Sequence, residues 1–346
     1  MRRSLPVPQM GLQRREFLTL AGAGAVSTVM LSACGKLGGG TKVKGPTIGM
    51  LQMVEAPPPT NTRKGFEAAL AEAGYIPGKN VNFIQKDAAG ELPNTTLVMK
   101  QFVGDQVDMI LAVGTPPLQA AMKVAPATTS VLFCYCSNPW GAGAGTPPGA
   151  VGQHKPNVVG TIGTNPVGKE LDLARQINPE LKTVGLIFNP GEPNSEYEAK
   201  VLKEEAAKRN ITVVEQSVAN SGEVLQAAQV LADKKVEAFV KIGDYATIQG
   251  FGSIAKVGLE KKIPVYSVDA DDIKLPGCLA TIGWAYFDDG YAAGKLAVRV
   301  LKGESPAKMA FEPLTKTELM VNKATAAAIG VTLPEELIKA AQKMVS

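Results

Sequence analysis

The chain has 346 residues, of which 45% are apolar, and it carries a formal net charge of +4. This length and composition exclude a disordered or fibrous chain and favour two domains. Residues 1–33 contain four arginines and one glutamate, which leaves a formal charge of +1 on the remainder. A nearly neutral body gives no electrostatic reason to expect a nucleic acid as a partner.

The N-terminal segment combines paired arginines with a short apolar stretch. Arg14 and Arg15 precede an apolar run that reaches Leu31, a pattern that resembles a twin-arginine export signal. The run is too short and too rich in glycine and alanine to be a comfortable membrane span. We therefore expect residues 1–33 to be an export signal.

A candidate lipidation site follows this segment directly. The sequence Leu-Ser-Ala-Cys that ends at Cys34 resembles the lipobox of bacterial lipoproteins, in which the cysteine is acylated. Residues 34–46 contain three consecutive glycines and predict a flexible tether. Together these features predict an exported, extracytoplasmic protein, in the periplasm or at the cell surface, that is anchored to a membrane through a lipid on Cys34.

From residue 47 onward, segments typical of strands and helices alternate. Short apolar runs predict strands at residues 47–53, 80–85, 107–113 and 130–136, and amphipathic segments predict helices at residues 62–73, 92–104 and 118–124. Residues 141–156 are rich in glycine and proline and predict a surface loop, after which residues 157–163 predict a short connecting strand. This alternation is typical of a parallel α/β layer.

A second alternating series follows. Helices are predicted at residues 166–178, 196–209, 223–234, 245–261, 285–301 and 334–344, with strands at residues 184–188, 212–217, 238–242, 264–268 and 278–282. The predicted fold class is therefore α/β, with two doubly wound parallel-sheet lobes.

The order of these elements predicts three connections between the lobes. We expect the chain to cross near Thr161, near Ile282 and near Pro306. The first lobe would then comprise residues 47–161 plus 283–305, and the second lobe residues 162–282 plus 306–346. A three-segment hinge of this kind lets two lobes close over a cleft.

Residues 184–195 illustrate where a ligand is expected. The apolar strand 184–188 runs into a polar loop, and Asn194 or Ser195 is a suitable N-cap for the following helix. The first amides of such a helix are free to hold an anionic group. Because ligands bind at the carboxyl ends of strands in open α/β sheets, this loop is a candidate binding loop.

Enzymatic chemistry finds little support in the sequence. The single histidine, His154, lies in the irregular stretch and offers no plausible base for a catalytic triad. The first strand is not followed by a glycine-rich turn, and no phosphate-loop motif occurs, so no cofactor is predicted. The acids around Asp269 and Asp289 leave an extracytoplasmic hydrolase as an alternative, but adjacency in sequence does not set the separation that such chemistry needs.

The cysteines give no clear metal or disulfide framework. Besides Cys34 the chain has Cys134, Cys136 and Cys278, an odd number. A bridge from Cys278 to one of the others remains open, and three buried thiols are the simpler interpretation. No metal site is predicted.

Several segments together resemble one family. Ile48-Gly-Met-Leu-Gln52, Val113-Gly-Thr-Pro116, Phe188-Asn-Pro-Gly-Glu-Pro-Asn-Ser195 and Ile263-Pro-Val-Tyr-Ser-Val-Asp269 follow one another as in the substrate-binding proteins of ABC transporters, and especially in the group with the tryptophan and aromatic amino-acid binders. The resemblance covers nearly all of residues 47–334. It implies a two-lobed type I periplasmic binding protein that delivers a small solute to a membrane permease.

The resemblance also implies ligand-binding residues at the strand ends. In the first lobe these are Gln52, Glu55, Gly114, Thr115, Ser137 and Asn138, and in the second lobe Asn189, Glu192, Asn194, Ser195, Asp244, Tyr245 and Asp269, with Trp284 near the hinge. Thr115 and Ser195 would hold a carboxylate, and Asp244 and Asp269 would accept from an ammonium group. Tyr245 or Trp284 would stack on a ring.

Each assignment has a structural alternative. Ser195 and Asp244 are also suitable helix caps, and Trp284 is also suitable as a core residue of the hinge. On balance the sequence predicts a monomeric solute-binding component of an ABC importer, not an enzyme, for an amino acid or similar solute. A hydrolase or a ligand-sensing receptor lobe with the same cleft is the alternative.

Overall fold

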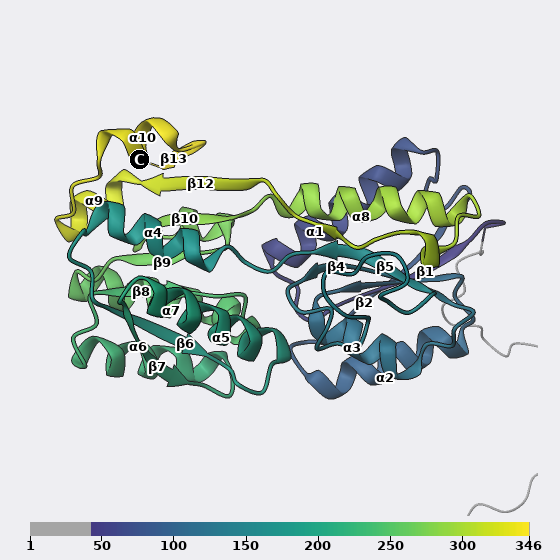
Figure 1. Ribbon diagram of the computed structural model, residues 1–346, viewed down its shortest axis with the longest axis horizontal. Helices are drawn as coiled ribbons and strands as arrows, with labels where there is room; N and C mark the ends of the chain where they lie inside the picture. The colour runs from purple at the N-terminus through teal and green to yellow at the C-terminus, as the bar shows by residue number, and fades with distance from the viewer. Residues whose placement is uncertain (1–42, 346) are drawn as a thin grey trace, which may run out of the picture. The chain divides into compact units, whose positions relative to one another are not determined.

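The computed structural model describes residues 43–345. The predicted export signal, Cys34 and most of the predicted tether lie outside the described residues. Within the described range the chain forms two sheets, each covered by helices on both faces (Figure 1). The predicted α/β fold class with two doubly wound lobes is therefore confirmed.

The first lobe is built on a six-stranded sheet with the order β11-β5-β4-β3-β1-β2. Its strands are β1 (Thr47–Gln52), β2 (Asn82–Asp87), β3 (Met109–Val113), β4 (Ser130–Cys136), β5 (Val158–Ile162) and β11 (Glu312–Pro313), and every neighbouring pair is parallel. Residues of β4 alternate between the two faces: Phe133 packs in one core and Leu132 in the other. Burial on both faces explains why the strand is a continuous apolar run.

Four helices cover the first sheet, namely α1 (Pro57–Glu72), α2 (Leu92–Gly104), α3 (Thr115–Val124) and α8 (Tyr286–Leu301). Helix α1 starts five residues before the predicted position, because three prolines occupy its first turn, where a missing N–H costs nothing. Helices α1 and α8 pack closely, and a β-carbon at Gly290 would lie 1.6 Å from the Thr62 carbonyl oxygen. Glycine is thus required at this crossing.

The second lobe is built on a seven-stranded sheet with the order β13-β12-β10-β9-β8-β6-β7. Its strands are β6 (Thr183–Phe188), β7 (Thr212–Ser217), β8 (Ala238–Lys241), β9 (Val265–Ser267), β10 (Cys278–Trp284), β12 (Thr317–Asn322) and β13 (Lys343–Val345). Its helices are α4 (Val167–Ile177), α5 (Pro193–Lys208), α6 (Val224–Asp233), α7 (Tyr245–Lys261), α9 (Lys323–Ile329) and α10 (Glu335–Ala340), with short 3₁₀ turns at η1 (Ser221–Glu223) and η2 (Ala270–Lys274). Strand β12 is antiparallel to β10, an exception to the predicted parallel order.

The connections between the lobes differ in part from the prediction. Strand β5 is a full neighbour of β4 in the first sheet, so the first connection follows at residues 163–166. The second leads from β10 into α8 at Ala285. The 3₁₀ turn η3 (Pro306–Lys308) is followed by β11, which pairs with β5, so the third connection occupies residues 314–316 and not the region of Pro306.

The C-terminal segment also differs from the prediction. A helix was expected at residues 334–344, but α10 ends at Ala340 and the chain then adds β13 beside β12. Edge strands this short carry too few residues for a recognisable alternation. No helix in residues 43–345 is long and apolar enough to cross a membrane.

The cysteines within residues 43–345, namely Cys134, Cys136 and Cys278, are buried and free.

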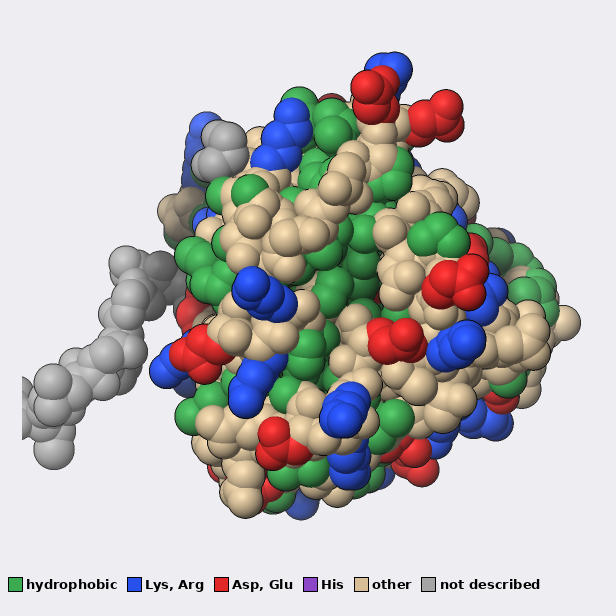
Figure 2. Space-filling view, turned by 90° about the vertical axis from the view of Figure 1, so that its left-hand side faces the viewer, with side chains coloured by type: hydrophobic (Ala, Val, Ile, Leu, Met, Phe, Trp, Pro, Cys, Tyr) green, Lys and Arg blue, Asp and Glu red, His purple; other side chains and the backbone are tan. Residues whose placement is uncertain are grey.

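Figure 2 shows the face of the second lobe that lies at the left of Figure 1, where basic and acidic side chains are interspersed. This face therefore has no extended basic patch of the kind that binds a phosphate backbone.

Candidate functional site

A cavity lies between the two lobes, where the carboxyl ends of several strands meet. Its lining residues come from both lobes and from the connections between them: Tyr135, Ser137, Gly163, Asn165, Asn194, Glu198, Gly243, Tyr245, Ile248, Trp284, Tyr286 and Asp289. The empty space is about 350 Å³, including the part open to solvent. This is the expected location for a ligand in open α/β sheets.

Four of the side chains that line the cavity are aromatic, and we call them the aromatic wall: Tyr135, Tyr245, Trp284 and Tyr286. The ring of Tyr135 contacts Tyr286 edge to face, with centroids 5.0 Å apart, and lies 6.5 Å from Tyr245 in a tilted arrangement. Burial raises the pKa of all three tyrosines, so their hydroxyls stay neutral. Such a wall suits a flat apolar group.

The backbone of Tyr135 is held in an unusual conformation. Its φ of 52° is in the left-handed region, which few non-glycine residues adopt. The Tyr135 N–H donates to Asp289 Oδ2 at 2.8 Å, and Thr161 Oγ1 donates to the other oxygen of the same carboxylate. The first turn of α8 therefore fixes the end of β4 and aims Tyr135 at the cavity.

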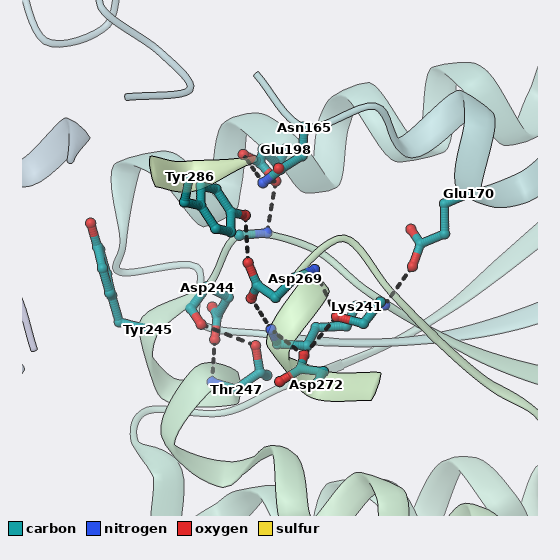
Figure 3. A network of polar contacts seen from close by, with 12 residues as sticks. Asn165, Glu170, Glu198, Lys241, Asp244, Tyr245, Thr247, Asp269, Asp272 and Tyr286 are labelled. Atoms are coloured by element: carbon teal, nitrogen blue, oxygen red, sulfur yellow. Dashed lines mark hydrogen bonds and ion pairs between the residues drawn. The ribbon is translucent and has the colours of Figure 1, made fainter. Parts of the chain in front are cut away.

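Two buried carboxyl groups border the cavity. Glu198 accepts from Asn165 Nδ2 at 3.0 Å through both oxygens and from the Gly243 N–H at 2.7 Å (Figure 3). Burial raises the pKa of Glu198 to about 7, although these donors act in the opposite direction. Burial likewise raises the pKa of Asp289 to about 6. Both groups thus titrate near neutrality.

Three residues that line the cavity each carry a buried polar atom with no hydrogen-bond partner among residues 43–345. These atoms are Ser137 Oγ, Asn165 Oδ1 and Asn194 Oδ1, from residues that are at most 8% exposed. Ser137 Oγ lies close enough to Glu198 to help lower its pKa, but it makes no hydrogen bond of ordinary geometry. Unpaired buried polar atoms are costly unless a ligand or water satisfies them.

An ion-pair network lies behind the aromatic wall. The Tyr286 hydroxyl donates to Asp269 Oδ1 at 2.5 Å, and Lys241 Nζ pairs with Asp269 and, at 2.9 Å, with Asp272 (Figure 3). Lys241 and Asp269 are almost completely buried. The carboxylates hold the pKa of Lys241 above its usual value against the effect of burial, so it remains charged. This network anchors Tyr286, which bridges the two lobes.

Some of the residues predicted from the sequence meet at this cavity. Ser137, Asn194, Tyr245 and Trp284 all border it. Trp284 also donates through Nε1 to the Thr164 carbonyl oxygen at 3.1 Å, which joins two of the connecting segments. Trp284 therefore combines the two roles that the sequence left open, cavity wall and hinge.

The predicted carboxylate and ammonium partners do not border the cavity. Helix α5 begins at Pro193 with Glu192 as N-cap, so neither Asn194 nor Ser195 caps it. Ser195 Oγ instead donates to Asp244 Oδ2 at 2.6 Å. Asp244 caps α7 through the Thr247 N–H at 2.6 Å and also accepts from the Asn189 N–H at 2.7 Å. Its carboxylate is thus fully occupied by the second lobe.

Two further residues that were expected to contact the ligand, Thr115 and Asp269, are also occupied by other residues of the protein. Thr115 is the first residue of α3, and its hydroxyl contacts Cys136 Sγ and accepts from the Asn138 N–H. Asp269 is occupied by Lys241 and Tyr286, so it supports the wall from behind. Neither residue lines the cavity.

The other predicted residues serve the local structure. Gln52 donates to Glu55 at 2.7 Å, and Glu55 is exposed outside the cavity. Asn138 accepts from the Gly141 N–H at 2.8 Å. Asn189 and Glu192 also form local contacts, in which Glu192 accepts from the N–H groups of Tyr245 and Ala246.

Sequence reasoning missed several cavity residues. Tyr135 precedes the predicted strand end by one residue, and its left-handed backbone departs from the regular strand geometry on which the sequence prediction relied. Glu198 lies one helical turn beyond Asn194, a spacing that places both on one face of α5. Tyr286 and Asp289 belong to α8, whose approach to the cavity depends on the second connection and carries no local signal.

The two-lobed architecture and the cavity define a periplasmic binding protein fold, in which a solute is held between two α/β lobes. Comparison of sequences agrees with this class. The family model of the ABC transporter substrate binding proteins matches residues 47–345, and the chain belongs to this family. The resemblance noted in the sequence is confirmed.

Two individual relatives have descriptions that name an aromatic amino acid. A tyrosine-binding protein of Clostridioides difficile (strain R20291) is 31% identical over 329 residues, which cover 92% of this chain and 93% of the relative. The structure of an ABC domain in complex with L-Trp from Streptococcus pneumonia has a TM-score of 0.80 and 27% identity, covering 87% of this chain and 100% of that chain. The first of these relatives is thus described as a binding protein for tyrosine, and the second as a complex with L-Trp.

A third comparison concerns the arrangement of the lobes. The ligand-free, open structure of a substrate binding protein with adhesive properties from Clostridium difficile is 31% identical, covers 87% of this chain and 99% of that chain, and has a TM-score of 0.66. The TM-score is higher for the L-Trp complex although its sequence identity is lower. The fold as a whole is therefore more similar to that of the L-Trp complex than to that of the open structure.

Proposed function

We propose that the protein is the solute-binding component of an ABC importer, that it holds an aromatic amino acid between its lobes, and that it delivers this solute to a membrane permease. The observation that carries the proposal is the aromatic wall, which faces a cavity shared by both lobes. Relatives described as a tyrosine-binding protein and as an L-Trp complex support an aromatic solute.

Closure of the lobes provides the mechanism. A solute that contacts Tyr135 of the first lobe and Glu198 of the second lobe stabilises the closed arrangement, because only this arrangement offers both contacts. The permease would then recognise the closed form. We propose that no covalent chemistry occurs, since the family consists of substrate-binding proteins.

The remaining proposals concern location and assembly. We propose that residues 1–33 export the protein, that a lipid on Cys34 anchors it outside the cytoplasm, and that it acts as a monomer without a cofactor. We propose that residues 47–162 with 286–313 form the first lobe and residues 167–284 with 317–345 the second lobe, which moves the predicted boundary at residue 306 to residues 314–316. Radiolabelled palmitate that is incorporated in the wild type but not after Cys34→Ser would support the anchor.

The experiment that tests the function starts from mass spectrometry of solute co-purified with the folded protein. We expect an intact aromatic amino acid. Isothermal titration after removal of this solute should show that L-Tyr, L-Trp or L-Phe binds at least about fivefold more tightly than L-Leu, the minimum expected from two additional aromatic contacts. A mixture of reaction products, or binding of a sugar without binding of any aromatic amino acid, would contradict the proposal.

A further inference from the structure

The cavity is also lined by side chains that carry hydrogen-bond acceptors. They are Glu198, Asn165, Asn194 and Ser137, and we call them the acceptor corner. No lysine or arginine is among the described residues that line the cavity. The charge and polarity of this corner therefore suit a group that donates hydrogen bonds.

The orientation of the two asparagine side chains follows from their bonded partners. Asn165 directs its amide nitrogen at the Glu198 carboxylate at 3.0 Å, and Asn194 directs its nitrogen at the Gly243 carbonyl oxygen at 2.7 Å. Both partners are acceptors, so the nitrogen atoms must face them and neither amide can be reversed. The oxygen atoms, Asn165 Oδ1 and Asn194 Oδ1, are left without a partner among residues 43–345.

Two amide oxygens, one serine hydroxyl and one carboxylate thus lie around the same space. An ammonium group has three N–H donors and a positive charge, which matches two unpaired acceptors beside a carboxylate. A carboxylate would instead place acceptor against acceptor.

We infer that the acceptor corner is an ammonium subsite, in which Glu198 is the counter-ion and Asn165 Oδ1 and Asn194 Oδ1 accept from the α-ammonium group of the solute. This inference rests on the proposed function and assigns the amino group, rather than the carboxylate, as the polar group that the cavity selects. Because the aromatic wall lines the same cavity, the subsite takes primary amines that carry a ring.

The ammonium group and the carboxylate of the ligand should contribute differently to affinity, and the two contributions can be measured separately. A ligand without the ammonium group leaves the buried acceptors unsatisfied, whereas a ligand without the carboxylate leaves them paired. Charged hydrogen bonds of this kind correspond to roughly 10- to 100-fold in affinity. We therefore expect a larger loss of affinity for the ligand without the ammonium group than for the ligand without the carboxylate.

Isothermal titration of the wild-type protein with three related compounds tests the inference. They are L-tyrosine, tyramine, which lacks the carboxylate, and 3-(4-hydroxyphenyl)propionate, which lacks the ammonium group; L-tryptophan, tryptamine and indole-3-propionate form the matching series. We expect removal of the ammonium group to weaken binding at least about 100-fold, and removal of the carboxylate to weaken it at least tenfold less than that.

A variant pair locates the subsite. Glu198→Gln keeps the shape of the side chain and should weaken the binding of the amino acid by 10-fold or more, with little effect on the compound without the ammonium group. Glu204→Gln on the same helix is the control, because Glu204 is exposed. Circular dichroism checks that each variant is folded. If Glu198→Gln does not fold, the titrations of the wild-type protein with the three compounds still test the inference.

The possible outcomes distinguish a failure of the proposed function from a failure of the ammonium subsite. If none of the amino acids binds, the proposed function is wrong. If the amino acids bind but the compounds without an ammonium group bind as tightly, or Glu198→Gln folds and binds the amino acid as tightly as the wild type, the ammonium subsite is wrong while the proposed function stands.

Discussion

The Tyr245 hydroxyl of the second lobe occupies the position beside Gly114 of the first lobe where a side chain would begin. A β-carbon built on Gly114 would lie 2.1 Å from the Tyr245 hydroxyl oxygen. Tyr245 packs in the core of the first lobe, although it is the first residue of α7 in the second lobe. This contact exists only while the lobes are together, so it is a determinant of closure.

Substitution Gly114→Ala should therefore oppose closure. We expect ligand affinity to fall about tenfold or more, because closure and binding are coupled and the new methyl group collides with Tyr245. Titration calorimetry measures the affinity, and small-angle scattering with ligand should show a smaller fraction of compact molecules.

Backbone strain must be separated from this collision. Gly114 has a φ of 115°, so alanine is strained there in any case. Gly74→Ala is the control, since Gly74 has a φ of 90° but a β-carbon there would contact nothing within 4 Å. In a double-mutant cycle with Tyr245→Ala, the effect of Gly114→Ala on affinity should largely disappear. An undiminished effect would attribute it to strain alone.

Ligand affinity should depend on pH through Glu198. Its pKa of about 7 is raised by burial and by nearby Asp269, and Glu170 is a further acid in this region. An ammonium ligand requires the ionised carboxylate, so affinity should be constant above pH 8 and fall toward tenfold per pH unit below pH 7. Calorimetry between pH 5.5 and 8.5 measures this slope, and Glu198→Gln should reduce it. Equal affinity at pH 6 and pH 8 would be inconsistent with a charged Glu198 in the complex.

The stability of the ligand-free protein should change with pH in the opposite sense. Glu198 has a folded-state pKa of about 7, above the value of 4.5 for an unperturbed glutamate. The folded protein then binds more protons than the unfolded chain between pH 4.5 and pH 7, so stability falls as pH rises through this window. The shift corresponds to about 3 kcal/mol at full ionisation. Urea unfolding at pH 5.5 and 8 should show about 2 kcal/mol of this loss, because part of it has already occurred at pH 5.5, and Glu198→Gln should lessen it.

The sequence predicted most of the fold because each lobe repeats an unambiguous pattern. Strands such as β4 are buried on both faces and appear as continuous apolar runs between turn formers. The antiparallel β12 and the short strands β11 and β13 were missed, since their pairing is set by distant residues. For the same reason the third connection was placed near Pro306, several residues too early.

The candidate site was predicted by region but only partly by residue. Strand ends and helix starts were the correct places to search, and Ser137, Asn194 and Tyr245 border the cavity. Polar residues at such places also cap helices and tie loops together, however, and Asp244 and Ser195 are consumed in this way. Which polar atoms remain free depends on packing that a single sequence does not reveal.

Asp269 is the residue whose role changes most, and its substitution separates a ligand contact from a supporting ion pair. As a direct contact, Asp269→Ala would weaken binding by about 2 kcal/mol with little loss of stability. In the structure the substitution leaves Lys241 buried with Asp272 as its remaining charged partner and deprives Tyr286 of its acceptor.

We therefore expect Asp269→Ala to lower the free energy of unfolding by about 3–5 kcal/mol. Urea titration measures this loss, with exposed Asp233→Ala as the control. Replacing Lys241 by methionine and Asp272 by asparagine as well should recover much of the stability, because no charged group is then left in the buried network. A stable Asp269→Ala variant that has lost affinity would instead restore Asp269 to the ligand site, since the loss would then arise from a missing contact and not from a disrupted core.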